Sequence, residues 1–453
     1  MHRLKDQEFQ TKLFSLVLPI AFQQFMLNLV SASDALMLGA VGQRELSAVS
    51  LAGQIQFVLS LFLAAMTIGV NIFAAQYWGK EDLSSVEKIF AIGMRVTIPV
   101  SAAFTLVTAL FPGGVMGIFT SDPALIAAGA GYLRLASVSY LFCGVSQIYL
   151  CIMKNTGHAK MSTAVSSACV AFDALMNAVL IFGLLGFPRM GIAGAALSTA
   201  IARLAEMCWC ILFLRGGKTA KLRVCYLSCP DAELGRDFWK YTAPVLGNEL
   251  VWGIGFTMYT VIMGHLGTDA VAANSIAGIV KNIVICFCTG LGSGGGILVG
   301  NELGAGRLEK AKEYGAKLCR AAVFSGLATG AVLLCITPLV LRLSNLSPTA
   351  NRYLLGMLVV CSFYIIAQSV NLMTFVGIFP AGGDSKFGFL CDAVVMWCIT
   401  VPLGFAAAFI LKLPVLAVYS IVNADELLKL PAVFRHYKKY LWVRDLTGEG
   451  SQV

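Results

Sequence analysis

With 58% hydrophobic and only 13% charged residues, this chain of 453 residues differs from soluble domains, in which roughly a quarter of residues are charged. The 14 cysteines do not indicate a disulfide framework, because most lie inside apolar segments and none has the spacing of a zinc site. The net charge of +9 is compatible with nucleic-acid binding, but its distribution argues against that partner. We therefore expect an integral membrane protein without a separate soluble domain.

Long apolar segments follow one another along the whole chain. A bilayer core of about 30 Å needs about 20 apolar residues per helix, and segments of this length predict twelve membrane-spanning helices. They are expected at 13–39, 47–75, 89–113, 126–152, 161–187, 191–214, 240–265, 269–299, 316–341, 351–377, 388–411 and 413–430. The first segment continues past Met37 without a small-residue cleavage site, so it is predicted to be a span and not a signal peptide.

The positive charges of the predicted loops are unevenly distributed. If both termini lie on one side of the membrane, most of the 33 Lys and Arg residues lie in the loops and termini of that side. The opposite loops carry only Arg44, Arg189, Arg342, Arg352 and Lys412. Because cytoplasmic loops carry the excess of positive charge, we expect a multi-pass protein of the inner (plasma) membrane with both termini in the cytoplasm. The basic charge then indicates orientation, and no nucleic-acid partner is expected.

Two halves of the chain repeat each other at a constant distance. Residues 34–53 align with residues 259–278, and the same lag of 225 residues places Pro19 on Pro244. The lag encloses six predicted spans, so both halves enter the membrane in the same direction. The expected fold is therefore an all-α membrane protein with two six-helix bundles related by a pseudo-twofold axis along the membrane normal.

The repeat also predicts the domain boundaries. We expect an N-terminal bundle at 1–214, a cytoplasmic linker at 215–239, a C-terminal bundle at 240–430 and a cytoplasmic tail at 431–453. The two prolines that the repeat superposes, Pro19 and Pro244, are predicted to kink spans one and seven. Such kinks would give these helices two available packings, which alternating access requires.

Several short motifs occur in a fixed order along nearly the whole chain. They include LGAVGQRELSAVSLA after Asp34, QYWGKED after span two, GNELGAG after span eight and AGGDSKF before span eleven. In these motifs the chain resembles the multidrug and toxic compound extrusion (MATE) family, in the version found in its bacterial branch. The resemblance implies a transporter, not an enzyme, that exports small organic, often cationic compounds in antiport with sodium or protons. No cofactor is expected besides the coupling ion, and we expect a monomer in the lipid bilayer.

Asp34, in span one, is the leading candidate for the residue that couples transport to an ion. A charged group costs at least about 2.5–3.5 kcal/mol near the centre of a membrane helix, and no basic residue lies within four positions of Asp34. A carboxylate without a fixed partner takes up a proton or sodium, which changes its desolvation cost. The alternative is an aspartate at the membrane interface that caps a loop.

Span five carries Asp173 and Asn177, four residues apart on one helix face. Their oxygens are ligands that a small cation prefers. The family resemblance implies that they form a cation site with Asp34 and with Thr199 of span six. In a sodium-coupled protein Asp34, Asp173 and Asn177 would be the metal ligands. Relatives usually have asparagine at position 173 and often aspartate at 177, so acid and amide are exchanged here. A hydrogen bond between helices is the alternative.

Glu249, in span seven, is the candidate acid of the second half. A buried glutamate beside Trp252 would attract an organic cation by charge and by cation–π contact, so we expect a substrate cleft here. Met258 and Tyr259 are expected on the same wall. The alternative pairs Glu249 with Lys281, which is the only lysine expected to need a partner inside a span.

Three further patterns have structural explanations. Arg203 and Glu206, three residues apart in span six, are predicted to form a local ion pair. The glycine cluster at 290–300 is predicted to permit close helix packing or bending, because the chain lacks the GxxxxGK[ST] pattern of a phosphate loop. Asp384 is predicted to be a loop acid on the cytoplasmic face.

Two other functions compete with drug export. A flippase of the same broad fold, moving lipid or lipid-linked oligosaccharide, would need several bases for anionic phosphates, whereas the candidate cleft acids match or outnumber Lys281. An intramembrane aspartyl protease would need Asp34 and Asp384 as a dyad. The GxGD signature of such proteases is absent, and the two acids are expected near opposite membrane faces. Export of a cationic or neutral compound is therefore favoured.

Overall fold

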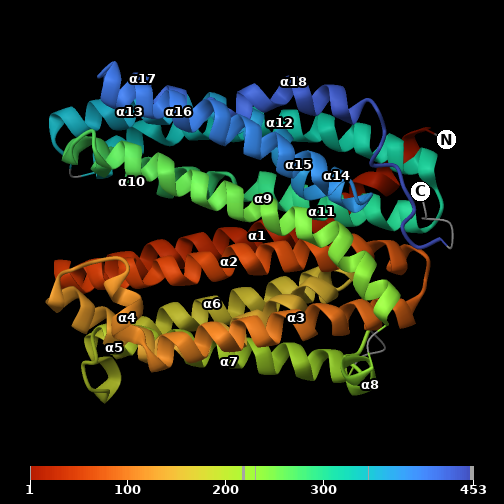
Figure 1. Ribbon diagram of the computed structural model, residues 1–453, viewed down its shortest axis with the longest axis horizontal. Coiled ribbons are helices and arrows are strands. Elements are labelled where there is room, and N and C mark those ends of the chain that lie inside the picture. Colours follow the sequence, from red (N-terminus) through yellow and green to blue (C-terminus); the bar gives the residue numbers. More distant parts are fainter. Residues whose placement is uncertain (1, 217–219, 230, 345, 449–453) are drawn as a thin grey trace. The chain divides into compact units, whose positions relative to one another are not determined.

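A computed structural model describes residues 2–216, 220–229, 231–344 and 346–448 (Figure 1). These residues form helices joined by short turns, and no strand occurs among them. Ten of the described helices are long and apolar enough to cross a membrane, and one bent helix pair makes an eleventh span. The prediction of an all-α, multi-span membrane protein is confirmed. The chain separates into two compact units, each described here by itself.

The N-terminal unit comprises Met26–Ala74 and Asp82–Phe238. The helices that lie wholly or partly in it are α1 (His2–Val41), α2 (Gln43–Gly79), α3 (Leu83–Leu110), α4 (Pro112–Gly117), α5 (Pro123–Asn155), α6 (Ala159–Phe182), the short η1 (Leu184–Gly186), α7 (Ile192–Gly216) and α8 (Val224–Ser228). Within this unit α5 packs against α3 and α7, and α6 packs against α7. Leu59, Leu133 and Tyr140 belong to its apolar core.

The C-terminal unit comprises the residues up to Phe25, Ala75–Glu81 and the chain from Trp239 onward. Its helices are α9 (Ala232–Gly264), α10 (Thr268–Val284), α11 (Cys286–Gly304), α12 (Leu308–Leu343), α13 (Pro348–Asn371), α14 (Phe379–Ala381), α15 (Ser385–Asp392), α16 (Val401–Phe405), α17 (Val415–Val422) and α18 (Asp425–Tyr437), with the π-helical segments η2 (Leu372–Ile378), η3 (Ala393–Thr400) and η4 (Ala406–Ile410). The predicted domain boundaries at 214, 239 and 430 stay predictions.

Local sequence signals explain where several helices begin. Asp82 accepts a hydrogen bond from the Ser85 backbone N–H at the start of α3, and Asp122 and Ser347 cap α5 and α13 in the same way. Proline occupies the first position of both α5 and α13, where its missing N–H costs nothing. The helix ends are therefore set by residues that satisfy otherwise unpaired backbone groups.

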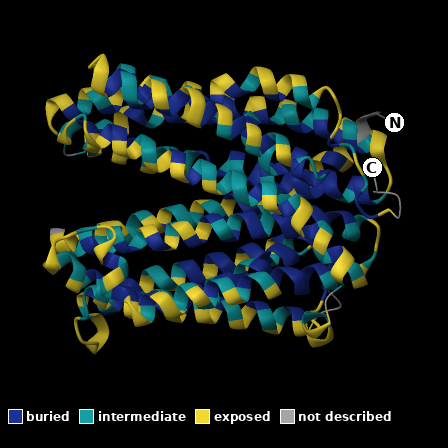
Figure 2. Cartoon of the chain, in the orientation of Figure 1, coloured by how far each residue is buried: buried dark blue, intermediate teal, exposed yellow. Residues whose placement is uncertain are grey.

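Pro19 and Pro244 lie inside α1 and α9, which are continuous helices. The predicted kinks at these two prolines stay predictions. The bend that the structure does have is at Ile285, where α10 and α11 meet at 45°. This bend lies at the beginning of the glycine-rich α11, which is buried along almost its whole length (Figure 2).

Two glycines that the repeat superposes lie where helix backbones touch. A Cβ atom on Gly79 would lie 2.0 Å from the carbonyl oxygen of Asn301, and a Cβ on Gly304 would lie 1.9 Å from that of Gln76. Gln76 and Asn301 are themselves 225 residues apart, so the contact is reciprocal. Only glycine permits this approach of α2 and α11. The spacing of the repeat is thus reflected in the packing.

The predicted twelfth span, 413–430, is interrupted. α17 ends at Val422, and α18 begins at Asp425 with two acids in its first turn. This segment is too short and too charged to count among the apolar spans, because Lys429 and Glu426 lie in its second half. Its charged side chains are nevertheless buried, so they require partners inside the unit.

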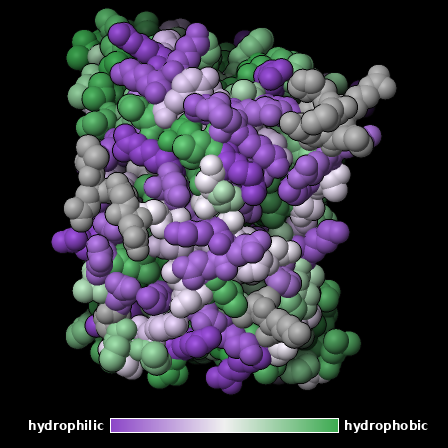
Figure 3. Space-filling view, turned by 90° about the vertical axis from the view of Figure 1, so that its right-hand side faces the viewer, coloured by the Kyte–Doolittle hydropathy of each residue, from purple (hydrophilic) through white to green (hydrophobic). Residues whose placement is uncertain are grey.

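The end of the chain packs onto the C-terminal unit. Trp442 is fully buried, and the Gln76 side chain donates to the carbonyl oxygens of Ala381 and Arg444 and accepts from the backbone N–H of Leu446. The described part of the predicted tail is therefore an ordered part of this unit. Both described chain ends lie on a face rich in hydrophilic side chains (Figure 3).

Candidate functional site

Asp34 and Asn177 are brought together in the N-terminal unit. The Nδ2 of Asn177, on α6, donates to Asp34 Oδ1 of α1 over 2.9 Å. Asn177 is buried, whereas Asp34 is half-buried. Among the described residues Asp34 forms no ion pair. A neutral amide is thus the hydrogen-bond partner of this carboxylate.

Asp173 points toward α7. The hydroxyl of Ser198 donates to Asp173 Oδ1 over 2.7 Å and to its carbonyl oxygen over 2.9 Å. Asp34 thus contacts Asn177, and Asp173 contacts the residue before Thr199; that the four predicted residues form one cation site stays a prediction. The sequence analysis missed Ser198, although it directly precedes Thr199 in the same helix.

The residues proposed as sodium ligands can be tested against the geometry. The described residues contain no group of three or more His, Cys, Asp or Glu side chains arranged to hold a metal, and the predicted set includes only two carboxylates. One feature does fit a cation. The Oδ1 of Asn177 is buried and has no hydrogen-bond partner in the structure. A small cation or a hydroxyl donor beside Asp34 would satisfy this oxygen.

Arg203 and Glu206 form the predicted local ion pair on α7. Their nitrogen and oxygen atoms are 2.9 Å apart, Glu206 is fully buried, and Ser146 donates to the same carboxylate oxygen over 3.0 Å. The prediction of a structural pair is confirmed. Because Glu206 holds the guanidinium of Arg203, this base is already paired within its own helix.

The C-terminal unit contains a cavity of about 160 Å³. Glu249 and Trp252, two of the predicted cleft residues, line it. Met258 and Tyr259 do not line it, and Tyr259 instead packs near Ile262 and Val418. The polar side chains of the lining are Asn248, Glu249, Gln368, Asn371, Asp392, Glu426 and Lys429.

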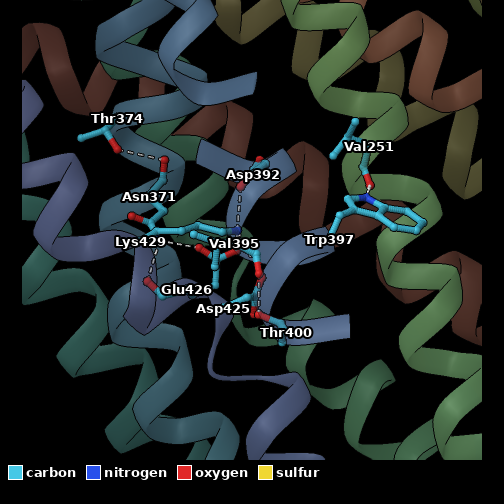
Figure 4. A network of polar contacts seen from close by, with 10 residues as sticks. All are labelled: Val251, Asn371, Thr374, Asp392, Val395, Trp397, Thr400, Asp425, Glu426 and Lys429. Carbon is cyan, nitrogen blue, oxygen red and sulfur yellow. Dashed lines mark hydrogen bonds and ion pairs between the residues drawn. The ribbon is translucent and has the colours of Figure 1, made fainter. Parts of the chain in front are cut away.

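Figure 4 shows a buried charged network, of which Asp392, Glu426 and Lys429 line this cavity. The Nζ of Lys429 lies 2.7 Å from an oxygen of Asp392, 3.1 Å from Asp425 and 3.4 Å from Glu426. The Lys429 side chain is only 1% exposed. Asn371 donates to the carboxylate of Glu426, so α13, α15 and α18 meet at this network. Lysine and three carboxylates thus form a single cluster away from water.

This network corrects the sequence analysis. Lys281 is not the only lysine that needs a partner inside a span, because Lys429 is also buried among helices. Among the described residues no ion pair joins Lys281 to Glu249, and the Lys281 ammonium lies 5.0 Å from the ring centre of Tyr364. The signal was present in the sequence as DELLK within the span predicted at 413–430.

Each unit thus has polar side chains in contact on apolar helices, an arrangement typical of membrane transporters. A family model described as MatE matches residues 19–179 and again residues 244–406. The two matches begin at Pro19 and Pro244, separated by the lag of the repeat. The chain therefore belongs to the MATE family of multidrug efflux transporters. Members of this family are transporters, so no catalytic residue is assigned.

Relatives of the chain share its length. It is 22% identical over 435 residues to the transporter YisQ of Bacillus subtilis strain 168, with 95% of each chain covered. It is 27% identical over 419 residues to a probable multidrug resistance protein NorM of Deinococcus radiodurans, with 85% of each covered. These relatives agree with the bacterial branch of the family.

Solved structures share the fold. A transporter of the MOP superfamily from Pyrococcus furiosus superposes with a TM-score of 0.87 at 14% identity, over 96% of each chain. An outward-facing multidrug resistance MATE transporter superposes with a TM-score of 0.86 at 15% identity, over 95% of each chain. The expected two-bundle, twelve-span MATE fold is thereby confirmed.

Proposed function

We propose that this protein exports small organic cations across the plasma membrane in antiport with protons or sodium, with both termini in the cytoplasm. The observation that carries the proposal is the environment of Asp34. Its hydrogen-bond partner is the neutral Asn177, and no base among the described residues forms an ion pair with it. A membrane carboxylate of this kind must be neutralised by an ion that arrives and leaves.

The charge of the C-terminal cavity supports a cationic substrate. Glu249, Asp392 and Glu426 line it together with the single base Lys429. A flippase substrate carries anionic phosphates, which such a lining would repel. Trp252 stacks on Phe256 with the ring centres 5.6 Å apart and adds an aromatic surface to the cavity wall. An organic cation is favoured by both the charge and the aromatic surface.

Coupling then follows from linkage. If the ion and the substrate each favour a different conformation, binding of one must weaken binding of the other by the same factor. In this proposal a proton or sodium binds at Asp34 and Asn177 from outside, and its binding favours release of the substrate. The residues Asp173 and Thr199 would shape the ion site, and Glu249 and Trp252 would contact the substrate.

The test is export from proteoliposomes with an imposed sodium or proton gradient, measured over a panel of organic cations. Asp34→Asn keeps the shape of the side chain and removes its charge, and we expect gradient-driven export to fall by about 100-fold. Glu309→Gln, at a side chain that is 85% exposed, is the matched control and should export normally. Unchanged export by Asp34→Asn would exclude Asp34 as the coupling residue.

A further inference from the structure

Lys429 occupies the centre of a site made of oxygen atoms. Asp425 and Glu426 belong to the first turn of its own helix, α18, whereas Asp392 comes from the end of α15. All three carboxylates lie within 3.4 Å of the same ammonium nitrogen. A free monovalent cation at this point would contact the same oxygens. The lysine therefore stands where a bound cation would otherwise be required.

The surrounding amides support the site from two further helices. When the amide of Asn248, on α9, is turned so that its nitrogen faces the neighbouring acceptors, Nδ2 donates to Asp392 Oδ2 over 2.9 Å, and the Nδ2 of Asn371, on α13, donates to Glu426. Both amides thus present their N–H groups to carboxylates. The network holds its acids in place independently of the lysine, as a binding site does.

Unsatisfied acceptors remain beside the ammonium. Asn371 is 3% exposed, and its Oδ1 has no hydrogen-bond partner in the structure. The Oε1 of Gln368 is likewise buried without a partner, and both residues line the 160 Å³ cavity. A volume of this size exceeds that of several water molecules. These oxygens are further acceptors for a cation that takes the place of the Lys429 ammonium.

The acids around Lys429 outnumber this one base. Glu249 lines the same cavity and forms no ion pair among the described residues, so four acids are accompanied by one lysine. Buried carboxylates without a partner are costly, and removing the base from such a cluster leaves the cost uncompensated. The lysine supplies one permanent positive charge that no dissolved ion has to deliver.

The backbone is also unusual at this site. Asn371 is the last residue of α13 before the π-helical η2, and Asp392 is the last residue of α15 before the π-helical η3. Segments of π-helix are rare and occur frequently at functional sites. Two of the residues that build the network thus each lie directly before such a segment.

We propose that Lys429 is a tethered cation that fills a monovalent-cation site formed by Asp392, Asp425 and Glu426 in the C-terminal unit. The site is therefore independent of dissolved sodium, and a small free cation enters it only when the lysine ammonium is removed. The inference concerns a site separate from Asp34 and does not depend on which compound is exported. It differs from a purely structural ion-pair cluster, which would not accept a free cation in place of the lysine.

The experiment uses the purified full-length protein in the Asp34→Asn background, so that ion binding at Asp34 does not contribute. Thermal unfolding is measured at equal ionic strength in choline, sodium or methylammonium chloride, with and without Lys429→Ala. We expect Lys429→Ala to lower the Tm in choline. At 100 mM, sodium and methylammonium, which matches the missing head group, should each raise the Tm of Lys429→Ala by roughly 2 to 5 °C relative to choline. This shift corresponds to a cation concentration about 10- to 100-fold above the Kd.

The parent with Lys429 should have the same Tm in all three salts. Lys281→Ala is the matched control, because Lys281 also lies in a predicted membrane span but contacts the rings of Phe256 and Tyr364 instead of carboxylates. Its Tm should not respond to the choice of cation. A Lys429→Ala protein that is equally stable in all three salts would overturn the proposal, and so would a parent that sodium stabilises to the same extent.

If Lys429→Ala cannot be purified, the double variant Lys429→Met with Asp425→Asn provides the same test. It removes one positive and one negative charge together, so fewer acids are left without a partner. We expect its Tm to rise in methylammonium relative to choline, by less than in Lys429→Ala. Absence of any rise would again overturn the tethered-cation proposal, whatever the outcome of the export assay on Asp34→Asn.

Discussion

In the N-terminal unit a carboxylate, Asp34, contacts a neutral amide, whereas in the C-terminal unit one lysine, Lys429, contacts three carboxylates. Both sites lie on helices of the same duplicated architecture. The residue that the repeat superposes on Asp34 is Tyr259, which is not an acid. The duplication has thus kept the backbone plan and changed the chemistry. One unit has an acid whose hydrogen-bond partner is neutral, and the other has one lysine, Lys429, among its acids.

The glycines at contacts between helix backbones are, in contrast to the polar residues, the same in both repeats. Gly79 and Gly304 remain glycine in both repeats because each backbone touches the partner helix. Side chains that point into a polar site can diverge without disturbing this packing. Glycines at helix contacts are thus distinguished from the polar residues that we propose to act in transport, and the following predictions test the two kinds separately.

The largest expected effect on stability is at the C-terminal network. Lys429→Met should destabilise the protein by about 3–5 kcal/mol, because it leaves buried carboxylates without a base. The measurement is denaturant or thermal unfolding of the protein in detergent. Lys438→Met, on a lysine at the end of α18 that lies against the Phe434 ring, is the control and should stay near the parent. A loss below about 1 kcal/mol for Lys429→Met would show that the acids do not depend on the lysine.

The second effect concerns the glycine contact that both repeats share. Gly79→Ala and Gly304→Ala should each cost about 1–3 kcal/mol or more, because the added Cβ overlaps a backbone carbonyl. Gly53→Ala is the matched control within α2, since a Cβ there meets nothing within 4 Å. Helix propensity favours alanine at such an open position by about 1 kcal/mol. Equal stability of Gly79→Ala and Gly53→Ala would contradict the described backbone contact.

The third prediction concerns the exchanged acid and amide of α6. Asn177→Ala removes the partner of Asp34 and should lower gradient-driven export by about 10-fold, close to 1.4 kcal/mol of coupling. The double variant Asp173→Asn with Asn177→Asp, which restores the order usual in the family, should retain more than half of the export. If Asn177→Ala exports normally while the double variant is inactive, the contact between Asp34 and α6 has no role in coupling.

The smallest effect lies outside the membrane helices. The backbone N–H of Leu234 and the Lys88 ammonium, 3.1 Å away, hold the pKa of Asp231 below its usual value. Since the folded state favours the charged form, the contribution to stability is present above the unfolded pKa and is lost as the pH falls through the folded one. Asp231→Asn should cost roughly 0.2–1 kcal/mol at pH 7, because the pair is partly exposed. The difference from the parent should shrink as the pH is lowered below about 4 in unfolding experiments.

The amino-acid sequence was sufficient for the all-helical membrane architecture, for most span positions and for the repeat. These features depend on residues close in the chain, on the length of apolar segments and on glycine and proline at fixed spacing. The ion pair of Arg203 with Glu206 was also predictable, because both residues lie on one helix three positions apart. The hypothesis that Asp34 couples transport to an ion followed from the cost of a charge in an apolar segment.

Only the tertiary structure decided which charges meet. Asp392, Asn371 and Lys429 come from three different helical elements, and no local pattern specifies their contact. The same holds for Ser198 beside Asp173 and for the absence of Met258 and Tyr259 from the cavity lining. Helix periodicity predicts on which face of its helix a side chain lies. Which residues of other helices contact that face depends on how helices distant in the sequence pack. A buried charge is therefore visible in the sequence, whereas its counter-ion is a property of the fold.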